Sequence, residues 1–375
     1  MGWCRGPEPW HFFPVPAGSR QFLPDFGRHG SCSGRSCLKS EVPHEAAIPL
    51  RKTAVIGGAG FIGARLLPHL ARPLVIDRSV SEEKPEAHRI DVRERERLAD
   101  ALGEVETVYL LAAEHADDVA PPSLYYDVNV GGAENVIAAA ESRGIRRIVF
   151  TSSVAVYGLN APDASEETQP DPFNDYARSK WEAEQKLMAW AERDRGRSLV
   201  IVRPCVVFGE GNRGNVHNLL RQVHSGRFVM VGNGRNRKSM AYVGNLARFL
   251  AGLEESPPGT QVFNYSDKPD LDMRRLVRVA AEELGVGLPR VAVPYPLGLL
   301  AGYGCDLVAR ITGRKLPVSS IRVRKFCAET TVDTSRLGST GFEAPYTLEE
   351  GLRRMIRADF LGDAPLADRP GSVSP

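Results

Sequence analysis

The sequence predicts an α/β protein with a doubly wound parallel sheet, and three features of residues 52–204 support this class. The predicted strands are short and continuously apolar, which is the pattern of strands buried on both faces. A helix-like segment separates each strand from the next, as parallel connections require. A glycine-rich turn joins the first strand to the first helix. Right-handed crossovers would then place helices on both faces of the sheet.

Apolar patterning sets the order of these elements. Strands are predicted at Thr53–Ile56, Leu74–Asp77, Thr107–Ala113, Arg147–Ser153 and Leu199–Arg203. Helices are predicted between them at 61–70, 93–102, 130–142 and 176–193. After Arg203 the pattern becomes irregular and richer in glycine and proline, which predicts a smaller second lobe.

The composition is that of a globular protein. The 375 residues are 42% hydrophobic and 25% charged, which excludes a wholly disordered chain. The formal net charge of +2 gives no indication of a nucleic-acid partner. Six cysteines are too few for a disulfide framework and lack metal-site spacing, so we expect reduced thiols, no metal and a cytoplasmic location.

No segment predicts a membrane span, which takes about 18 apolar residues. The nearest approach, 293–311, is interrupted by Asp306 and Arg310. This segment predicts a buried or amphipathic helix instead.

Changes in composition divide the chain into several parts. Residues 1–50 are rich in Pro, Gly, Ser and Arg without periodicity, which predicts a disordered extension, with a targeting segment or sequence upstream of the true start as alternatives. Residues 51–204 form the predicted cofactor-binding core. A substrate-binding lobe is predicted at 205–362, with 241–284 returning to the core, and a flexible tail at 363–375.

The glycine-rich turn has the spacing of a dinucleotide site. Gly57, Gly60 and Gly63 follow a strand and open a helix, where they permit a tight turn and a close approach to a pyrophosphate. Asp77 ends the second strand, where its carboxylate can accept hydrogen bonds from a ribose and would repel a 2′-phosphate. This favours NAD over NADP, although the neighbouring Arg78 weakens the choice. The predicted fold is thus a Rossmann-type doubly wound parallel sheet with a smaller irregular C-terminal lobe.

A second pattern predicts proton chemistry. Tyr176 and Lys180 are four residues apart on a predicted helix and therefore share a face. A nearby ammonium would lower the pKa of the phenol and make it a usable base. Ser153 ends the fourth strand, at the edge where open α/β sheets bind ligands. Tyr-x-x-x-Lys by itself is most often part of a solvated helix face. The presence of Ser153 at the ligand-binding edge makes a catalytic set the better interpretation.

With these motifs the sequence resembles the extended short-chain dehydrogenase/reductases, and in particular the NAD-dependent nucleotide-sugar epimerase/dehydratase group, over about 52–360. Within that group it is similar to the UDP-glucose 4-epimerases. The motifs that carry the resemblance are Gly57-x-x-Gly60-x-x-Gly63, Asp77, Asp91-Val92, Leu111-Ala-Ala113, Asn129 to Asn135, Thr151 to Gly158, Tyr176-x-x-x-Lys180, Arg203-Pro204 and Leu348 to Leu352.

The resemblance implies a role for individual residues. Ser153, Tyr176 and Lys180 match the catalytic triad of the family. The implied cofactor contacts are Gly57, Gly60, Phe61, Ile62, Gly63, Asp77, Arg78, Asp91, Val92, Leu111, Ala112, Ala113, Asn129, Tyr176, Lys180 and Pro204. The implied substrate contacts are Ser153, Asn215, Val216, Arg237 and Lys238, with a solvated basic loop as the ordinary interpretation of the last two.

Two departures from the family narrow the expected reaction. Val154 and Ala155 stand where the family's dehydratases carry an Asp-Glu pair and its decarboxylases a Glu, so neither chemistry is expected. Val206 stands where many epimerases place an asparagine, which puts the diphosphate contacts in doubt.

The expected activity is epimerisation of a nucleotide sugar, at C4 of a UDP-hexose, with NAD as cofactor. One alternative is an NAD(P)-dependent dehydrogenase or reductase of the 3β-hydroxysteroid or sugar type, in which 294–311 would form a lipophilic lid. Another is an NAD-binding protein without catalysis. A homodimer through 126–142 and 176–193 and a place in polysaccharide precursor synthesis are what the family suggests.

Overall fold

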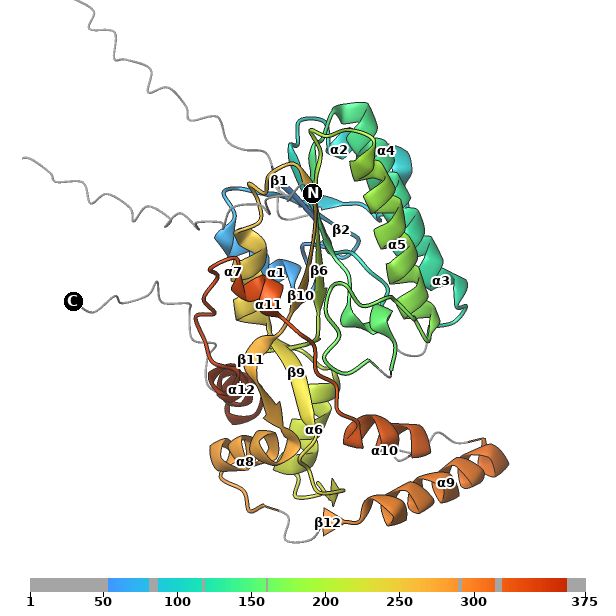
Figure 1. Cartoon of the computed structure of the whole chain (residues 1–375), viewed down its shortest axis with the longest axis vertical. Coiled ribbons are helices and arrows are strands. Elements are labelled where there is room, and N and C mark those ends of the chain that lie inside the picture. The colour runs from blue at the N-terminus through green and yellow to red at the C-terminus, as the bar shows by residue number, and fades with distance from the viewer. Residues whose placement is uncertain are drawn as a thin grey trace, which may run out of the picture.

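The structure is a computed structural model that describes residues 53–80, 87–116, 119–159, 161–288, 292–313 and 319–362. The expectations for residues 1–50 and 363–375 lie outside these ranges. A large sheet with helices on both faces forms one end of the described molecule, and a smaller lobe forms the other (Figure 1).

The large sheet has seven strands in the order β10-β6-β5-β4-β1-β2-β3, and every neighbouring pair is parallel. The strands are β1 (Thr53–Ile56), β2 (Leu74–Asp77), β3 (Ala87–Arg89), β4 (Thr107–Leu110), β5 (Arg147–Thr151), β6 (Ser198–Pro204) and β10 (Gly259–Tyr265). This order is that of a doubly wound nucleotide-binding sheet, so the predicted fold class is confirmed. Two of the seven strands, β3 and β10, were not among those predicted, and the three residues of β3 are partly exposed and lack an apolar run.

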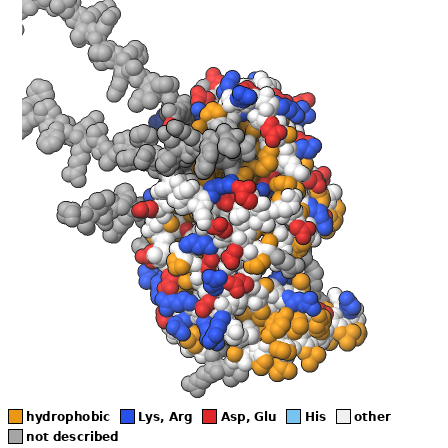
Figure 2. Space-filling model, in the orientation of Figure 1, with side chains coloured by type: hydrophobic (Ala, Val, Ile, Leu, Met, Phe, Trp, Pro, Cys, Tyr) orange, Lys and Arg blue, Asp and Glu red, His pale blue; other side chains and the backbone are white. Residues whose placement is uncertain are grey.

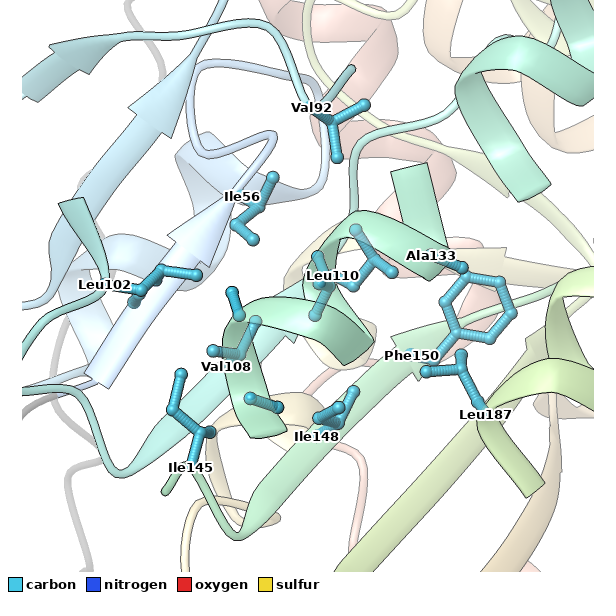
Figure 3. Close-up of a cluster of buried hydrophobic side chains, with 14 of the residues drawn as sticks. Ile56, Val92, Leu102, Val108, Leu110, Ala133, Ile145, Ile148, Phe150 and Leu187 are labelled. Atoms are coloured by element: carbon cyan, nitrogen blue, oxygen red, sulfur yellow. The ribbon is translucent and has the colours of Figure 1, made fainter. Parts of the chain in front are cut away.

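Alternate residues of the central strands enter different cores, because side chains of a strand point to opposite faces. Ile56, Val108, Leu110, Ile148 and Phe150 pack on one face of the sheet (Figure 3). The residues between them on the same strands, including Tyr109 and Val149, pack on the other face. Burial on both faces explains why the strands read as unbroken apolar runs in the sequence.

Helices cover both faces of the large sheet (Figure 1). One face carries α2 (Arg95–Ala101), α4 (Gly131–Arg143) and α5 (Asp175–Glu192), and the other carries α1 (Gly63–Leu66) and α7 (Val243–Ala251). The Asn174 side chain caps α5 by accepting a hydrogen bond from the Ala177 amide, 2.8 Å away. This cap fixes the first turn of α5, which carries Tyr176.

The smaller lobe has its own core, built on a three-stranded sheet. The sheet consists of β7 (Val206–Phe208), β9 (Arg237–Tyr242) and β11 (Asp267–Asp272), and α6 (Asn215–His224), α8 (Met273–Leu284) and α12 (Leu348–Ile356) pack around it. At its far end lie β8 (Met230–Val231), β12 (Ala292–Val293), α9 (Tyr295–Thr312) and α10 (Ser320–Cys327). The remaining short elements are η1 (Leu67–His69), α3 (Ser123–Tyr125), η2 (Tyr126–Val130), η3 (Val154–Tyr157), α11 (Ser335–Gly338) and η4 (Arg357–Leu361).

Two short connections join the large sheet to the smaller one. Cys205 alone separates β6 from β7, and Ser266 alone separates β10 from β11. The two connections are bonded to each other, since the Cys205 amide donates to the Tyr265 carbonyl at 2.9 Å. Residues 241–284 are therefore shared, with α7 and β10 on the large sheet and α8 in the smaller lobe.

Among the described residues, no helix is both long enough and apolar enough to cross a membrane.

Packing predicts where truncation is costly. Leu187→Ala should lower the free energy of unfolding by about 2–5 kcal/mol, because this fully buried α5 side chain would leave a cavity in the main core. Leu361→Ala is the matched control and should change it by less than about 0.5 kcal/mol, because Leu361 is half exposed. Urea unfolding of both variants checks this, and equal losses would contradict the assignment of the core.

Candidate active site

The glycine turn after β1 is held by main-chain hydrogen bonds and has no room for side chains. The Gly57 amide donates to the Ile76 carbonyl of β2 at 2.8 Å, and Gly57 has a φ of +88°. A Cβ on Gly57 would lie 2.5 Å from the Ala112 amide nitrogen, and one on Gly63 would lie 2.4 Å from the Gly57 carbonyl oxygen. Both positions therefore require glycine.

This turn fits the pyrophosphate of a dinucleotide. The close approach of Gly57 and Gly63 to the neighbouring main chain leaves the outer side of the turn free of side-chain atoms from these positions. The Asp77 carboxylate, at the end of β2, accepts hydrogen bonds from the amides of Ala59 at 3.1 Å and Ser79 at 2.8 Å. These bonds hold a carboxylate beside the turn, where a ribose with a free 2′-hydroxyl is the matching group. Phe61 and Ile62 lie between the turn and α1 and pack partly against both neighbouring cores.

The charged residues that follow β2 and β3 are paired with groups nearby. Arg78 lies 3.9 Å from the Glu114 carboxylate, so its charge is partly matched. Arg93 forms two hydrogen bonds with Asp91, at 3.0 and 2.8 Å, and these bonds lower the pKa of Asp91. The Val92 side chain is buried against Gly132 of α4, and the Val92 carbonyl accepts a hydrogen bond from the Asn135 side chain at 3.0 Å.

Residues 111–113 continue from β4 along the same edge. The amides of Leu111 and Ala112 both donate to the Ile56 carbonyl, at 2.8 and 2.9 Å, which holds this segment against the glycine turn. Ala113 follows it and is partly exposed. The segment therefore packs beside the turn, and its contact with the cofactor stays a prediction.

Asn129 is a positioning residue in this structure. It is buried, and its side chain accepts from the Glu114 amide at 2.9 Å and donates to the Glu114 carbonyl and to Ser179 Oγ at 3.1 and 2.9 Å. Ser179 in turn donates to the Tyr176 carbonyl at 2.9 Å. Asn129 thus joins the segment after β4 to the first turn of α5.

The structure brings Ser153 and Tyr176 together. Ser153 follows β5, and its Oγ accepts a hydrogen bond from the Ala155 amide at 3.1 Å. The Tyr176 ring is partly exposed, but the surrounding protein raises the pKa of its phenol. Burial is the largest cause and the nearby Tyr125 adds to it, whereas a hydrogen bond with the Ser153 hydroxyl acts in the opposite direction.

Lys180 lies one turn further along α5, with only 2% of its surface exposed. Its Nζ donates to the Thr151 carbonyl at 2.9 Å and lies 4.8 Å from the centre of the Phe150 ring. Burial lowers the pKa of Lys180 to about 7, with Glu184 acting against this shift. The groups that act on the pKa of Tyr176 in this structure are its own burial, Ser153 and Tyr125, and the effect of Lys180 expected from the sequence stays a prediction.

Apart from Ser153, the expected substrate residues belong to the smaller lobe, and their surroundings differ. Val216 is buried in the core of that lobe, whereas its neighbour Asn215 is exposed at the start of α6. The exposed Arg237 pairs with Glu329 at 3.0 Å. Lys238 donates to the carbonyls of Lys325 and Ala328, at 3.0 and 2.5 Å, and burial lowers its pKa to about 8. Lys238 thus anchors the end of α10, and Pro204 is buried at the end of β6.

A buried ion pair behind the site was not predicted from the sequence. The Arg203 guanidinium donates to both carboxylate oxygens of Glu184, at 3.0 and 2.5 Å, and to the Tyr157 hydroxyl at 2.7 Å. Tyr157 donates onward to Asn264 of β10 at 2.8 Å. Glu184 lies four residues after Lys180 on α5, and this spacing is the signal that could have placed it on the same face.

Substitution at the turn should separate cofactor binding from folding. Gly63→Ala should weaken NAD binding by at least about tenfold, because its Cβ would displace the Gly57 carbonyl that shapes the turn. Gly131→Ala is the control, since a Cβ there has the Tyr126 carbonyl oxygen as its nearest neighbour, at 3.8 Å. Calorimetric titration with NAD measures both, and unchanged affinity in Gly63→Ala would remove the turn from the cofactor site.

The lowered pKa of Lys180 predicts how stability depends on pH. Between about pH 7 and the unfolded value near 10.5, the unfolded chain binds more protons at this residue than the folded one, so the contribution of Lys180 to stability rises with pH. The unfolding free energy of the wild type relative to Lys180→Met should rise by up to about 1.4 kcal/mol per pH unit over that range. Urea unfolding of nucleotide-stripped protein at several pH values measures this difference.

Lys186→Met is the control for that experiment. Lys186 pairs with Glu134 at 2.8 Å on the outside of α5, which raises the pKa of Lys186. The wild type should therefore gain no stability relative to this variant as the pH rises. The same rise in both comparisons would show that the Lys180 ammonium is not the cause.

Comparisons with known proteins agree with the geometry. The model of the NAD dependent epimerase/dehydratase family matches residues 53–264. The chain is 50% identical to the N-acetyl-alpha-D-glucosaminyl-diphospho-ditrans,octacis-undecaprenol 4-epimerase of Escherichia coli O157:H7, over 82% of this chain and 95% of the relative. It is 31% identical to the UDP-glucose 4-epimerase of Vibrio cholerae, over 67% of this chain and 75% of the relative.

The UDP-glucose 4-epimerase of Thermus thermophilus, solved with NAD, has the same fold. It superposes with a TM-score of 0.63 at 22% identity, over 82% of this chain and 98% of that one. Together with the glycine turn, Asp77 and the Ser153–Tyr176–Lys180 set, these findings identify the chain as a member of the NAD-dependent epimerase/dehydratase family and as an enzyme whose cofactor is NAD.

Proposed function

We propose that the enzyme inverts C4 of an N-acetylated hexose that is linked through a diphosphate to a polyprenol. The observation that carries the reaction is the Ser153–Tyr176 pair at the end of β5, beside the glycine turn and with Lys180 one turn along α5. The relative that acts at C4 of such a sugar shares 50% of its residues with this chain over 95% of its own length.

The proposed mechanism moves one proton through Tyr176. Bound NAD supplies a hydride acceptor and donor for C4. Tyr176 Oη takes the proton of the 4-hydroxyl as the C4–H bond breaks, and Ser153 Oγ holds the same oxygen through a hydrogen bond. The resulting 4-keto sugar turns over in the cleft, and Tyr176 returns its proton to the oxygen as C4–H forms again on the other face. Proton and hydride are both restored, so no net oxidation occurs.

The lowered pKa of Lys180 and the raised pKa of Tyr176 are consistent with activation by bound ligand. Lys180 has three donors, and one of them is directed at Thr151. Ligand oxygens at the remaining donors would favour the ammonium form and raise the pKa of Lys180 from about 7. A charged Lys180 would then lower the pKa of Tyr176, which desolvation raises.

Diphosphate recognition is proposed to involve Arg237 rather than Lys238. The Arg237 side chain is half exposed and pairs with the similarly exposed Glu329, so a diphosphate can compete for its guanidinium. The Lys238 ammonium is half-buried and donates to two carbonyls that end α10. Asn215, exposed at the start of α6, is the proposed sugar-side contact from that helix.

The diphosphate sugar could be carried by a nucleoside or by a polyprenol, and the polyprenol is favoured. The Vibrio cholerae relative is named for UDP-glucose and the Escherichia coli relative for an undecaprenol-linked sugar. Val206, which stands where many epimerases place an asparagine, is half exposed and offers no hydrogen bond from its side chain. An apolar group at this position and the higher identity favour the polyprenol, with the nucleotide sugar as the second candidate.

A dehydrogenase would differ from an epimerase in its NAD balance. The proposed reaction restores NAD in every cycle, whereas a dehydrogenase releases NADH in proportion to product. Homodimerisation through 126–142 and 176–193 stays a proposal of the same kind, and the outward Lys186–Glu134 ion pair lies on these helices.

Tyr176→Phe should lower kcat by about 10²–10⁴-fold while NAD still binds, because only the proton carrier is removed. Tyr126→Phe is the matched control: its hydroxyl donates to Asp175 at 3.1 Å outside the catalytic set, and activity should stay within about twofold. The assay follows conversion of a short-chain polyprenyl diphospho-N-acetylglucosamine in detergent to its C4 epimer. Near-full activity of Tyr176→Phe would remove the catalytic assignment.

The same assay with UDP-N-acetylglucosamine decides the carrier. We expect a higher kcat/KM on the polyprenyl substrate. A higher value on the UDP-sugar would transfer the proposal to nucleotide sugars, and NADH formed in proportion to product would replace it with a dehydrogenase.

A further inference from the structure

Helix α9 packs with its small residues inward and its large apolar residues outward. A Cβ on Gly298 would lie 2.5 Å from a Val231 methyl of β8, and one on Gly302 would lie 2.8 Å from the Ser320 main chain of α10. These two glycines are the buried residues of the helix. A helix of the fold core would show the reverse arrangement.

The outward side is a continuous apolar stripe. At 3.6 residues per turn, its five large residues fall within about 100° of the helix circumference. They are Leu297, Leu300, Leu307, Val308 and Ile311, all exposed, with Ile311 at 76% and Leu300 at 67%. Figure 2 shows hydrophobic side chains gathered over the end of the molecule where α9 lies in Figure 1. We call these five residues the α9 face.

Basic side chains accompany the α9 face on α9 itself and on the neighbouring α10. Arg310 is exposed near the end of α9, and Arg322, Arg324 and Lys325 are exposed on α10. The one acidic residue of the two helices, Asp306, is partly buried and accepts a hydrogen bond from the Ser320 amide at 3.1 Å. An apolar stripe with a basic border is the pattern of a helix that lies in the surface of an anionic bilayer.

The α9 face is connected to the catalytic segment through α10. Lys325 lies over the ring of Phe173 at 5.8 Å, and Phe173 is exposed three residues before Tyr176. Lys238 of β9 holds the end of the same helix through two hydrogen bonds. The position of α10 is therefore fixed by contacts from both sides of the site.

We infer that the α9 face docks the enzyme on the surface of an anionic lipid bilayer, with Leu300, Leu307 and Ile311 inserted among the acyl chains and Arg310 near the headgroups. The inference rests on the proposed function, because a polyprenyl substrate resides in a membrane and its diphosphate sugar lies at the membrane surface. Docking through α9 would hold the site close to that sugar.

Flotation of the full chain, loaded with NAD, with vesicles of phosphatidylcholine and phosphatidylglycerol tests the inference. The wild type should float with these vesicles and bind pure phosphatidylcholine more weakly. Ile311→Glu should weaken binding by about tenfold, and Leu300→Glu with Ile311→Glu should abolish it. Leu361→Glu, which changes a 45% exposed leucine of η4, is the matched control and should bind like the wild type. Arg310→Gln should weaken binding to the anionic vesicles by about fivefold and leave binding to phosphatidylcholine unchanged.

Several outcomes would overturn the docking surface. One is that the wild type does not float with the vesicles, and another is that Leu361→Glu loses as much vesicle binding as Ile311→Glu. A third is that the wild type binds no vesicles but forms an oligomer that Ile311→Glu dissociates, which would make the face an interface between two copies. Turnover of the short-chain substrate in detergent is measured on the same variants and should be unchanged. Its absence in a wild type that floats would count against the proposed function alone, whereas turnover without flotation would count against docking alone.

Discussion

Two main-chain segments pack closely at the carboxyl ends of the central strands β1 and β4, and this packing determines the geometry of the site. The glycine turn after β1 and the segment after β4 meet where the Ile56 carbonyl accepts two amides from Leu111 and Ala112. A side chain at Gly57 would force them apart. The distance between the cofactor turn and the chemistry at the end of β5 therefore depends on backbone contacts, which side-chain mobility alters little.

Polar side chains extend this arrangement from the sheet to the helix that carries the reactive phenol. Asn129 connects the main chain at Glu114 to Ser179, and Ser179 connects to the Tyr176 carbonyl. Each of these groups is satisfied by another, so the network resists displacement of the first turn of α5. The Arg203–Glu184 pair is a second support, because it ties α5 to β6 beneath the site.

The fold class and the close-packed glycine turn could be predicted from the sequence because they depend on local patterns. Apolar runs marked the central strands, and glycine spacing marked the turn at Gly57. Contacts between distant segments were not accessible in this way. The Lys180 side chain is directed toward the Thr151 carbonyl, and burial lowers its pKa; both depend on packing that only the folded structure creates. The surroundings of Lys238 and Val216 could not be predicted for the same reason. Lys238 anchors the end of α10, and Val216 fills the core of the smaller lobe.

The two connections between the sheets limit how the lobes can move. Cys205 and Ser266 are single-residue links, and the bond from Cys205 to Tyr265 couples them. A hinge needs several adjacent residues that can change their backbone angles, and two coupled links of one residue do not offer this freedom. The two links therefore restrict bending between the two sheets at this point. Residues positioned by the large sheet, such as Ser153, and residues of the smaller lobe, such as Asn215, are thus carried on one connected frame.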